Sequence, residues 1–153
     1  FRSLKGSPEF RERFVLSFMD MLNNNFAPAN VEKVLADYGY TLDWQDGFFR
    51  KRPAYAAAHL AEEFGLTGSL ETVTVTTAHP EMGSVTVNTS RIDLSTGSWS
   101  GQYFTDYPIT VTAAANDGYK FVGWKGDTGG AGETVTVSVD GGITLEAVFA
   151  KVQ

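Results

Sequence analysis

The chain has 153 residues, of which 42% are hydrophobic and 13% aromatic, enough to form the core of one domain or of two small ones. Its 12 basic and 18 acidic residues give a net charge of -6, which argues against a nucleic-acid partner. The absence of cysteine excludes disulfides, thiolate metal sites and cysteine catalysis. No run approaches the roughly 18 consecutive apolar residues of a membrane span, and we find no secretory signal. Because the first residue is Phe1, we expect a fragment of a longer protein.

Apolar residues recur at helical spacing from the start of the chain to about Phe64. Ser7-Pro8-Glu9 is typical of a helix start, with an N-cap residue, a first-turn proline and an acidic residue near the helix dipole. The first helix is therefore predicted over residues 8–24, where the asparagines at 23–25 end it.

Two prolines divide the rest of this helical part. Pro28 is expected to open a second helix, and Gly39 to close it. Residues 47–52 look helical, but a proline inside a helix removes a hydrogen bond. We therefore predict that Pro53 begins a new helix, which Gly65 ends.

From about Thr72 onward the apolar residues alternate with polar ones, as in half-buried strands. Clusters of Gly, Pro, Asn and Asp separate six predicted strands, which are residues 72–77, 84–88, 109–113, 120–124, 134–139 and 143–149. The predicted fold class is α+β: an N-terminal helical segment of three to four helices, followed by a small all-β domain that is β-grasp-like or sandwich-like. The predicted boundaries are 1–66 for the helical segment, 67–71 for a linker and 72–150 for the β domain.

We predict no catalytic, cofactor-binding or metal-binding residue in this chain. The glycine-rich run 126–132 lacks the Lys-Ser or Lys-Thr ending of a P-loop, and we expect a hairpin loop there. His59 and His79 fall in different halves and lack the spacing of zinc ligands. Three aspartates could offer oxygen ligands to calcium but are expected in turns: Asp117, Asp127 and Asp140.

The densest aromatic cluster is Trp99, Tyr103, Phe104 and Tyr107, and Trp124 lies further along the chain. Exposed rings at these positions would form a patch that binds sugars or proteins. Buried rings would instead fill the core of a small domain, which is the interpretation that we favour. These five aromatics are the candidate ligand-binding or packing residues.

The run Asn116-Asp117-Gly118-Tyr119-Lys120-Phe121-Val122-Gly123-Trp124, followed by Gly126 and closed by Leu145-Glu146-Ala147-Val148-Phe149, resembles the divergent internalin-type B-repeat of bacterial surface proteins. The resemblance covers residues 72–149. It implies a compact β module, β-grasp-like or related, of the kind found singly or repeated on secreted and cell-surface proteins.

The helical half resembles the C-terminal helices of the CotH-type secreted kinase family, named for a spore coat protein. The resemblance lies in residues 1–26 and 48–66, and it continues into the patterns at 99–104 and 108–113. Residues 39–47 are shorter than the corresponding segment of that family, through either a natural deletion or missing chain. The family's ATP-binding and metal-binding residues lie upstream of the matched region, so the resemblance implies ATP and magnesium for the parent protein and no catalytic role for any residue here.

We therefore expect a non-catalytic C-terminal fragment of a CotH-like spore coat or secreted atypical kinase, with a β module that anchors or positions it. The alternatives are a surface adhesion or carbohydrate-binding module without kinase activity, and a structural unit without a ligand. The resemblances imply an extracytoplasmic location and a protein or cell-envelope partner. Helices without partners could also drive self-association through apolar residues, for which the candidates are Phe1, Leu4, Phe48, Phe49 and Tyr55.

Overall fold

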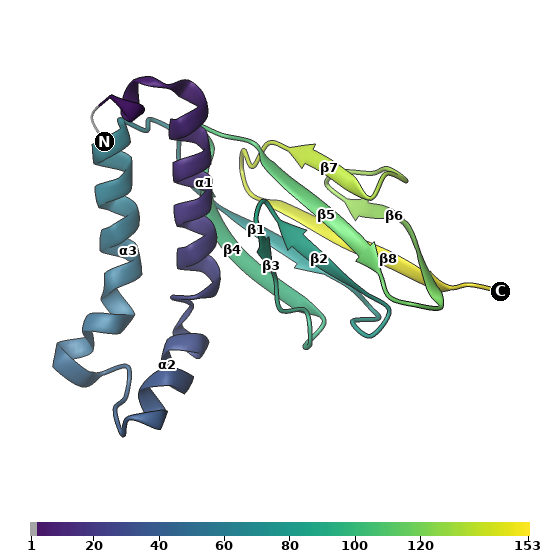
Figure 1. The fold of residues 1–153 in the computed structure, drawn as a ribbon, viewed down its shortest axis with the longest axis horizontal. Helices are drawn as coiled ribbons and strands as arrows, with labels where there is room; N and C mark the ends of the chain where they lie inside the picture. The colour runs from purple at the N-terminus through teal and green to yellow at the C-terminus, as the bar shows by residue number, and fades with distance from the viewer. Residues whose placement is uncertain (1–2) are drawn as a thin grey trace. The chain divides into compact units, whose positions relative to one another are not determined.

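The computed structural model describes residues 3–153, except for the side chains of Gln45 and Asp46. The chain divides into two compact units, Phe1–Thr67 and Gly68–Gln153. The first is helical and the second is built from strands, so the predicted α+β class is confirmed (Figure 1).

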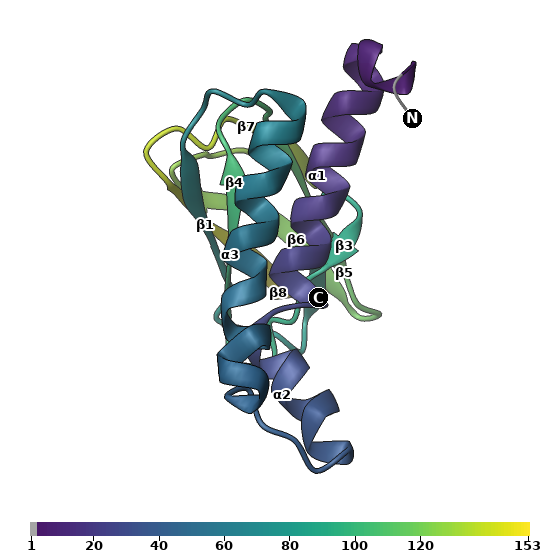
Figure 2. The same ribbon diagram turned by 90° about the vertical axis from the view of Figure 1, so that its left-hand side faces the viewer.

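The helical unit contains a short 3-10 helix and three α-helices: η1 (Leu4–Gly6), α1 (Pro8–Asn24), α2 (Pro28–Asp37) and α3 (Trp44–Phe64). Ser7 caps α1 as predicted, because its side chain accepts a hydrogen bond from the backbone N–H of Phe10. Figure 2 shows α1 and α3 side by side. Their contact includes the rings of Phe14 and Phe64, whose centroids lie 5.0 Å apart.

The prediction that Pro53 begins a helix is wrong, because α3 continues through it. The proline removes one backbone hydrogen bond in the helix interior. The first turns of α3 are held instead by packing, since Phe49 lies against a buried cluster formed by Val31, Leu35 and Leu42. These contacts extend the helix on the N-terminal side of the proline.

The β unit contains eight strands: β1 (Leu70–Thr76), β2 (Gly83–Val87), β3 (Ser90–Arg91), β4 (Ser98–Phe104), β5 (Ile109–Ala115), β6 (Tyr119–Gly126), β7 (Thr134–Val137) and β8 (Ile143–Lys151). They form two four-stranded sheets in the orders β4-β1-β8-β6 and β3-β2-β5-β7. The pairing of β1 with β8 is parallel, and the other strand pairs are antiparallel.

Apolar side chains on alternate positions of the two sheets form one core. Fully buried examples are Val73, Val75, Val85, Val87, Ile109, Val111 and Leu145. The sheets meet closely where Gly83 of β2 lies against the ring of Phe149 of β8. Of the two predicted β architectures, this arrangement is the sandwich-like one.

All six predicted strands exist, and β3 and β4 are additional. The sequence of β4 contains two serines, a glycine and a glutamine, which is weak strand composition. Its strand conformation comes from long-range pairing with β1, from Leu70 opposite Phe104 to Thr76 opposite Ser98. The same pairing places residues 70 and 71 in β1 rather than in the predicted linker.

The glycine-rich run 126–132 does not form the predicted hairpin loop. β6 belongs to one sheet and β7 to the other, so this segment crosses between sheets. It first folds back on β6, where the backbone N–H of Trp124 donates to the carbonyl of Gly130 at 2.8 Å. The chain then leaves to pair with β5, because Thr134 and Val135 find their partners there.

Candidate functional site

The structure buries three of the five candidate aromatics. The exposed fractions are 0% for Tyr103, 7% for Phe104 and 3% for Trp124. Trp99 and Tyr107 are half-buried. Trp99 and Tyr103 share one face of β4 because they are four residues apart, and Trp99 lies opposite the buried Val75. The five rings therefore do not form an exposed binding platform.

Trp124 also organises the loop that follows it. Its indole Nε1 donates a hydrogen bond to the carbonyl of Gly132 at 3.1 Å. Its ring lies 5.3 Å from that of Phe121, which in turn lies 5.6 Å from that of Phe149. The aromatic residues of the Gly-Tyr-Lys-Phe-Val-Gly-Trp run are thus joined to the closing strand through the core.

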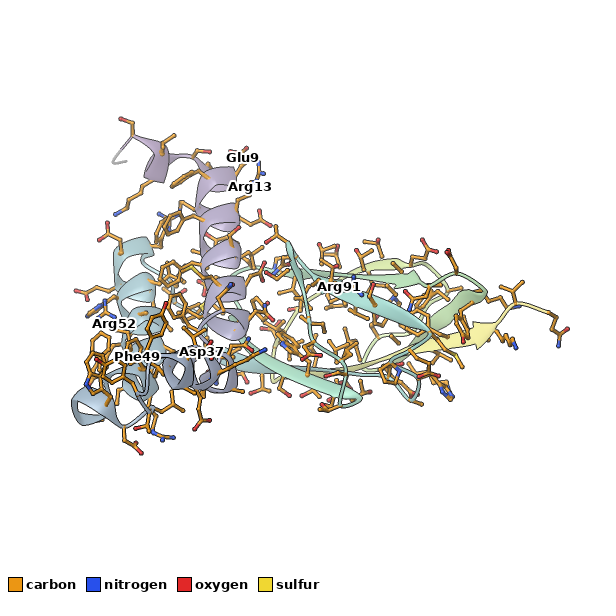
Figure 3. The ribbon with its side chains drawn as sticks, turned by 60° about the horizontal axis from the view of Figure 1, so that its bottom comes forward. Glu9, Arg13, Asp37, Phe49, Arg52 and Arg91 are labelled. Atoms are coloured by element: carbon orange, nitrogen blue, oxygen red, sulfur yellow. The ribbon has the colours of Figure 1, made fainter. Side chains whose placement is uncertain are left out.

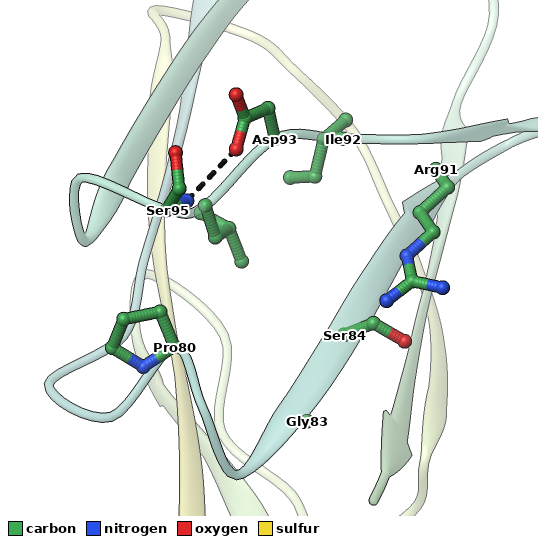
Figure 4. Close-up of a pocket in the computed structure, with 8 residues that line it drawn as sticks. Pro80, Gly83, Ser84, Arg91, Ile92, Asp93 and Ser95 are labelled. Atoms are coloured by element: carbon green, nitrogen blue, oxygen red, sulfur yellow. Dashed lines mark hydrogen bonds between the residues drawn. The ribbon is translucent and has the colours of Figure 1, made fainter.

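The β unit contains an open cavity of about 430 Å³ between the start of β2 and the segment that follows β3. Figure 4 shows its lining, which consists of Pro80, Gly83, Ser84, Arg91, Ile92, Asp93, Leu94 and Ser95. Ile92 and Leu94 are buried, while Arg91 and Asp93 are exposed. The alternation of the segment 91–95 therefore places two apolar side chains inward and two charged ones at the surface.

The two charges of this cavity have opposite sign and stand on opposite sides. In Figure 4 the guanidinium of Arg91 lies beside Ser84, away from the carboxylate of Asp93. The backbone N–H of Ser95 donates to Asp93 at 2.9 Å, and this bond, together with the Ser95 side chain, lowers the pKa of Asp93 below 3.8. The cavity can accept a small ligand that offers an anionic group to Arg91 and a hydrogen-bond donor to Asp93.

Sequence reasoning missed this cavity. The pattern Ser90-Arg91-Ile92-Asp93-Leu94-Ser95 does show alternating charged and apolar residues, which could have indicated a half-buried segment with charges on one side. It gives no indication that Pro80 and Ser84 lie across from it, because that neighbourhood depends on the pairing of β2 with β3.

A second, shallow hollow lies on α1 and is lined by Glu9, Phe10, Arg13, Phe14 and Ser17. Figure 3 labels Glu9 and Arg13 on this helix. The hydroxyl of Ser7 donates to Glu9 at 2.7 Å and lowers the pKa of that carboxyl below 4.5.

Several aromatic side chains gather where α2 leads into α3. The rings of Tyr40 and Trp44 stack at 4.4 Å, and Trp44 also stacks on Phe49 at 6.0 Å. Of the residues predicted to drive self-association, Leu4, Phe48 and Tyr55 are exposed, whereas Phe49 is half-buried (labelled in Figure 3). Phe1 lies outside the described residues.

Two of the three predicted turn aspartates, Asp127 and Asp140, accept hydrogen bonds next to strand ends. Asp127 accepts from the backbone N–H of Thr144 at 2.6 Å, and Asp140 accepts from the hydroxyl of Ser138. Within residues 3–153, no group of three or more His, Asp or Glu side chains is placed to hold a metal ion. The helices described by the structure include none that is long and apolar enough to cross a membrane.

Residues 72–153 match the model of one protein family, the divergent InlB B-repeat domain. This finding confirms the resemblance of the β unit, whereas the resemblance of the helical unit to CotH-type kinases stays a prediction. No curated protein and no solved structure matches the chain.

Proposed function

Because the match spans more than half of its residues, this chain belongs to the divergent InlB B-repeat family, and we propose that its β unit is a non-catalytic module that anchors or positions a larger protein outside the cytoplasm. Domains of this family are typical of surface-associated bacterial proteins, so the chain is a cell-surface-associated β module.

The observation that carries the proposal is the interior position of the family's signature residues. Trp124 is 3% exposed and bonded to the loop after β6, and Phe149 is 5% exposed and packed against Gly83. The most distinctive residues of the sequence therefore maintain the two-sheet fold rather than contact a substrate. A module whose most distinctive residues are used for packing is suited to serve as a rigid body.

The extracytoplasmic location can be tested with single cysteines, since the chain has none of its own. Glu133 is exposed in the crossing loop and Val85 is fully buried in β2. In intact cells that make the natural full-length protein, with any cysteine outside these 153 residues replaced by serine, a thiol reagent that cannot cross membranes is expected to label Glu133→Cys and to spare Val85→Cys. Labelling of Glu133→Cys only after lysis would contradict the proposal.

For the helical unit, we propose the end of a CotH-type kinase domain that lacks the catalytic residues. The support is the order of the resembling blocks at 1–26, 48–66 and 99–113. The purified chain is expected neither to bind ATP with magnesium nor to label itself with phosphate, whereas a protein extended upstream is expected to do both. Metal-dependent phosphate transfer by the chain alone would contradict its assignment as non-catalytic.

The alternative function, adhesion or glycan binding, is favoured by the cavity at Arg91 and Asp93. Retention on purified cell-wall glycans can be measured for Arg91→Gln, with Lys125→Gln as the control because Lys125 is an exposed cation of β6 outside the cavity. If the cavity binds glycans, Arg91→Gln loses retention and Lys125→Gln keeps it. Equal retention of both variants and the unmodified chain would remove this alternative.

A further inference from the structure

The first strand of the β unit begins, and its last strand ends, at opposite ends of one sheet. β1 and β8 are parallel neighbours, with Val73 level with Ile143 and Thr76 level with Glu146. Leu70 lies three positions before Val73 in β1, and Lys151 lies eight positions after Ile143 in β8, so the two ends are 11 strand positions apart. At the rise of a strand this is about 36 Å. Figure 1 shows β1 beside β8, with the C-terminus beyond the far end of the sheet.

We propose that β1 and β8 form a mechanical clamp, which enables the β unit to bear tension between the two ends of a surface protein. Tension would draw β1 toward its N-terminal end and β8 toward its C-terminal end. The two strands would then have to slide along each other, because they are parallel. Sliding strains all the hydrogen bonds between the strands at once, whereas opening from one end breaks them one after another.

Both clamp strands are interior strands of their sheet, in the order β4-β1-β8-β6. β4 pairs with β1 over the full length of β1, and β6 pairs with β8 from Leu145 to Lys151. Neither clamp strand is therefore a free edge that tension could peel away. The outer strands also remain hydrogen-bonded to the clamp strands while tension acts on the chain ends.

Side chains seal the clamp on its core side. Val73, Val75 and Leu145 are all 0% exposed, so water has no access from this face to replace a strained hydrogen bond. Thr76 adds a side-chain hydrogen bond between the strands, because its hydroxyl donates to the carbonyl of Leu145 at 3.4 Å. Movement of β1 past β8 would require these core side chains to leave their packing positions.

The turn before β8 brings the two strands close together. Gly142 has a φ of +78°, and a Cβ at this position would lie 3.1 Å from the carbonyl oxygen of Thr72 in β1. A residue with a side chain would be strained there and would push against β1. The sequence Gly141-Gly142 thus permits β8 to begin directly beside β1.

The clamp can be tested by single-molecule force spectroscopy on the full chain, which has no cysteine to interfere with engineered attachment points. Cysteines at Ser69 and Gln153 load β1 and β8 in opposite directions along their axes. Cysteines at Ala78 and Gln153 pull both strands from the same end of the pair. The rupture force is expected to be at least about twofold higher for the first pair, because forced unfolding reports the barrier along the direction of pulling. Equal forces for the two pairs would overturn the proposal.

Two valine variants separate the clamp from general stability. Val75 in β1 and Val85 in β2 are both 0% exposed, and truncation to alanine removes the same volume from the same core. The Val75→Ala and Val85→Ala variants are expected to lose similar resistance to urea, but only Val75→Ala should lower the rupture force between residues 69 and 153. An equal decrease in rupture force for both variants would contradict the clamp.

This inference rests on the proposed function in one respect: the β unit must belong to a surface protein that transmits tension through both ends of the unit. The two can fail separately. If the two cysteine pairs rupture at equal force while Glu133→Cys is labelled on intact cells, the clamp is overturned and the surface location stands. If the 69–153 pair ruptures at the higher force but Glu133→Cys is labelled only after lysis, the extracytoplasmic location is overturned and the clamp stands.

Discussion

The ring of Phe149 lies where a side chain at Gly83 would have to be, which makes these two residues a matched pair across the two sheets. A Cβ at Gly83 would also approach the carbonyl oxygen of Ala114 to 2.8 Å. Phe149 is only 5% exposed in the core, and Ala114 belongs to β5, the strand that is hydrogen-bonded to β2. The close approach of β2 and β8 therefore depends on the absence of a side chain at this glycine.

Gly83→Ala is expected to lower the free energy of unfolding of the β unit by about 1 to 3 kcal/mol, the range typical of an overpacked core. Urea unfolding followed by tryptophan fluorescence measures the change. Gly129→Ala is the control, since no atom lies within 4 Å of a Cβ at Gly129. In the double variant with Phe149→Leu, the smaller side chain should recover part of the loss, and strict additivity would refute the steric pairing.

Trp124 should contribute both a hydrogen bond and a large apolar ring. Trp124→Phe removes the bond from Nε1 to Gly132 and is expected to cost about 1 kcal/mol. Trp124→Ala also removes the ring and is expected to cost about 3 to 5 kcal/mol. Urea unfolding measures both variants. Hydrogen exchange should show faster opening of residues 126–132 in Trp124→Phe, and unchanged exchange there would mean that the indole does not hold the loop.

Trp99 tests the choice between packing and binding. Its half-buried ring lies opposite Val75, so Trp99→Ala should reduce stability, but by less than the about 3 to 5 kcal/mol expected for a fully buried ring. Melting temperature and retention on cell-wall glycans should be measured together. A normal melting temperature with lost retention would assign Trp99 to ligand binding instead.

Ser7 should stabilise the start of α1. Ser7→Ala removes the cap on the backbone N–H of Phe10 and is expected to destabilise the helical unit by about 1 kcal/mol. Thermal unfolding followed by circular dichroism measures the effect. Ser17→Ala is a matched control, because Ser17 is exposed in the interior of the same helix. Equal melting of the two variants would exclude a capping role.

The same hydroxyl makes the helix start sensitive to acid. Ser7 lowers the pKa of Glu9 below 4.5, so the stabilisation from their bond is present above pH 4.5 and is lost as the pH falls through the lowered pKa. In Ser7→Ala the pKa of Glu9 should rise toward 4.5. Carbon-13 NMR titration of the carboxyl group measures this shift, and an unchanged pKa would contradict the assigned bond.

Asp93 should remain ionised to lower pH than an ordinary aspartate. Its pKa is lowered below 3.8 first by the backbone N–H of Ser95 and then by the Ser95 side chain. Ser95→Ala keeps the first bond, so the pKa of Asp93 should rise but stay below 3.8. A return to 3.8 in an NMR titration would mean that the backbone bond contributes nothing.

Local periodicity was sufficient to predict most elements. The spacing of apolar residues and the cap at Ser7 predicted α1 and α2, and the alternation of Thr and Val predicted β7 and most of β1. These features depend on neighbours within a turn or a few residues along a strand. Of the dense aromatic cluster for which core packing was favoured, Tyr103 and Phe104 are buried, while Trp99 and Tyr107 are half-buried.

By itself, therefore, the sequence determined the α+β class, the order of helices before strands and the membership of the β unit in its family. Only the tertiary structure decided that α3 continues through Pro53, that β4 is a strand, that residues 126–132 cross between sheets and that β1 lies parallel to β8. The same holds for the cavity at Arg91. The physical reason is that these features depend on contacts between residues far apart in the chain. The free energy of such contacts can exceed the local conformational preference of a segment, and the contacts leave no periodic pattern in the sequence.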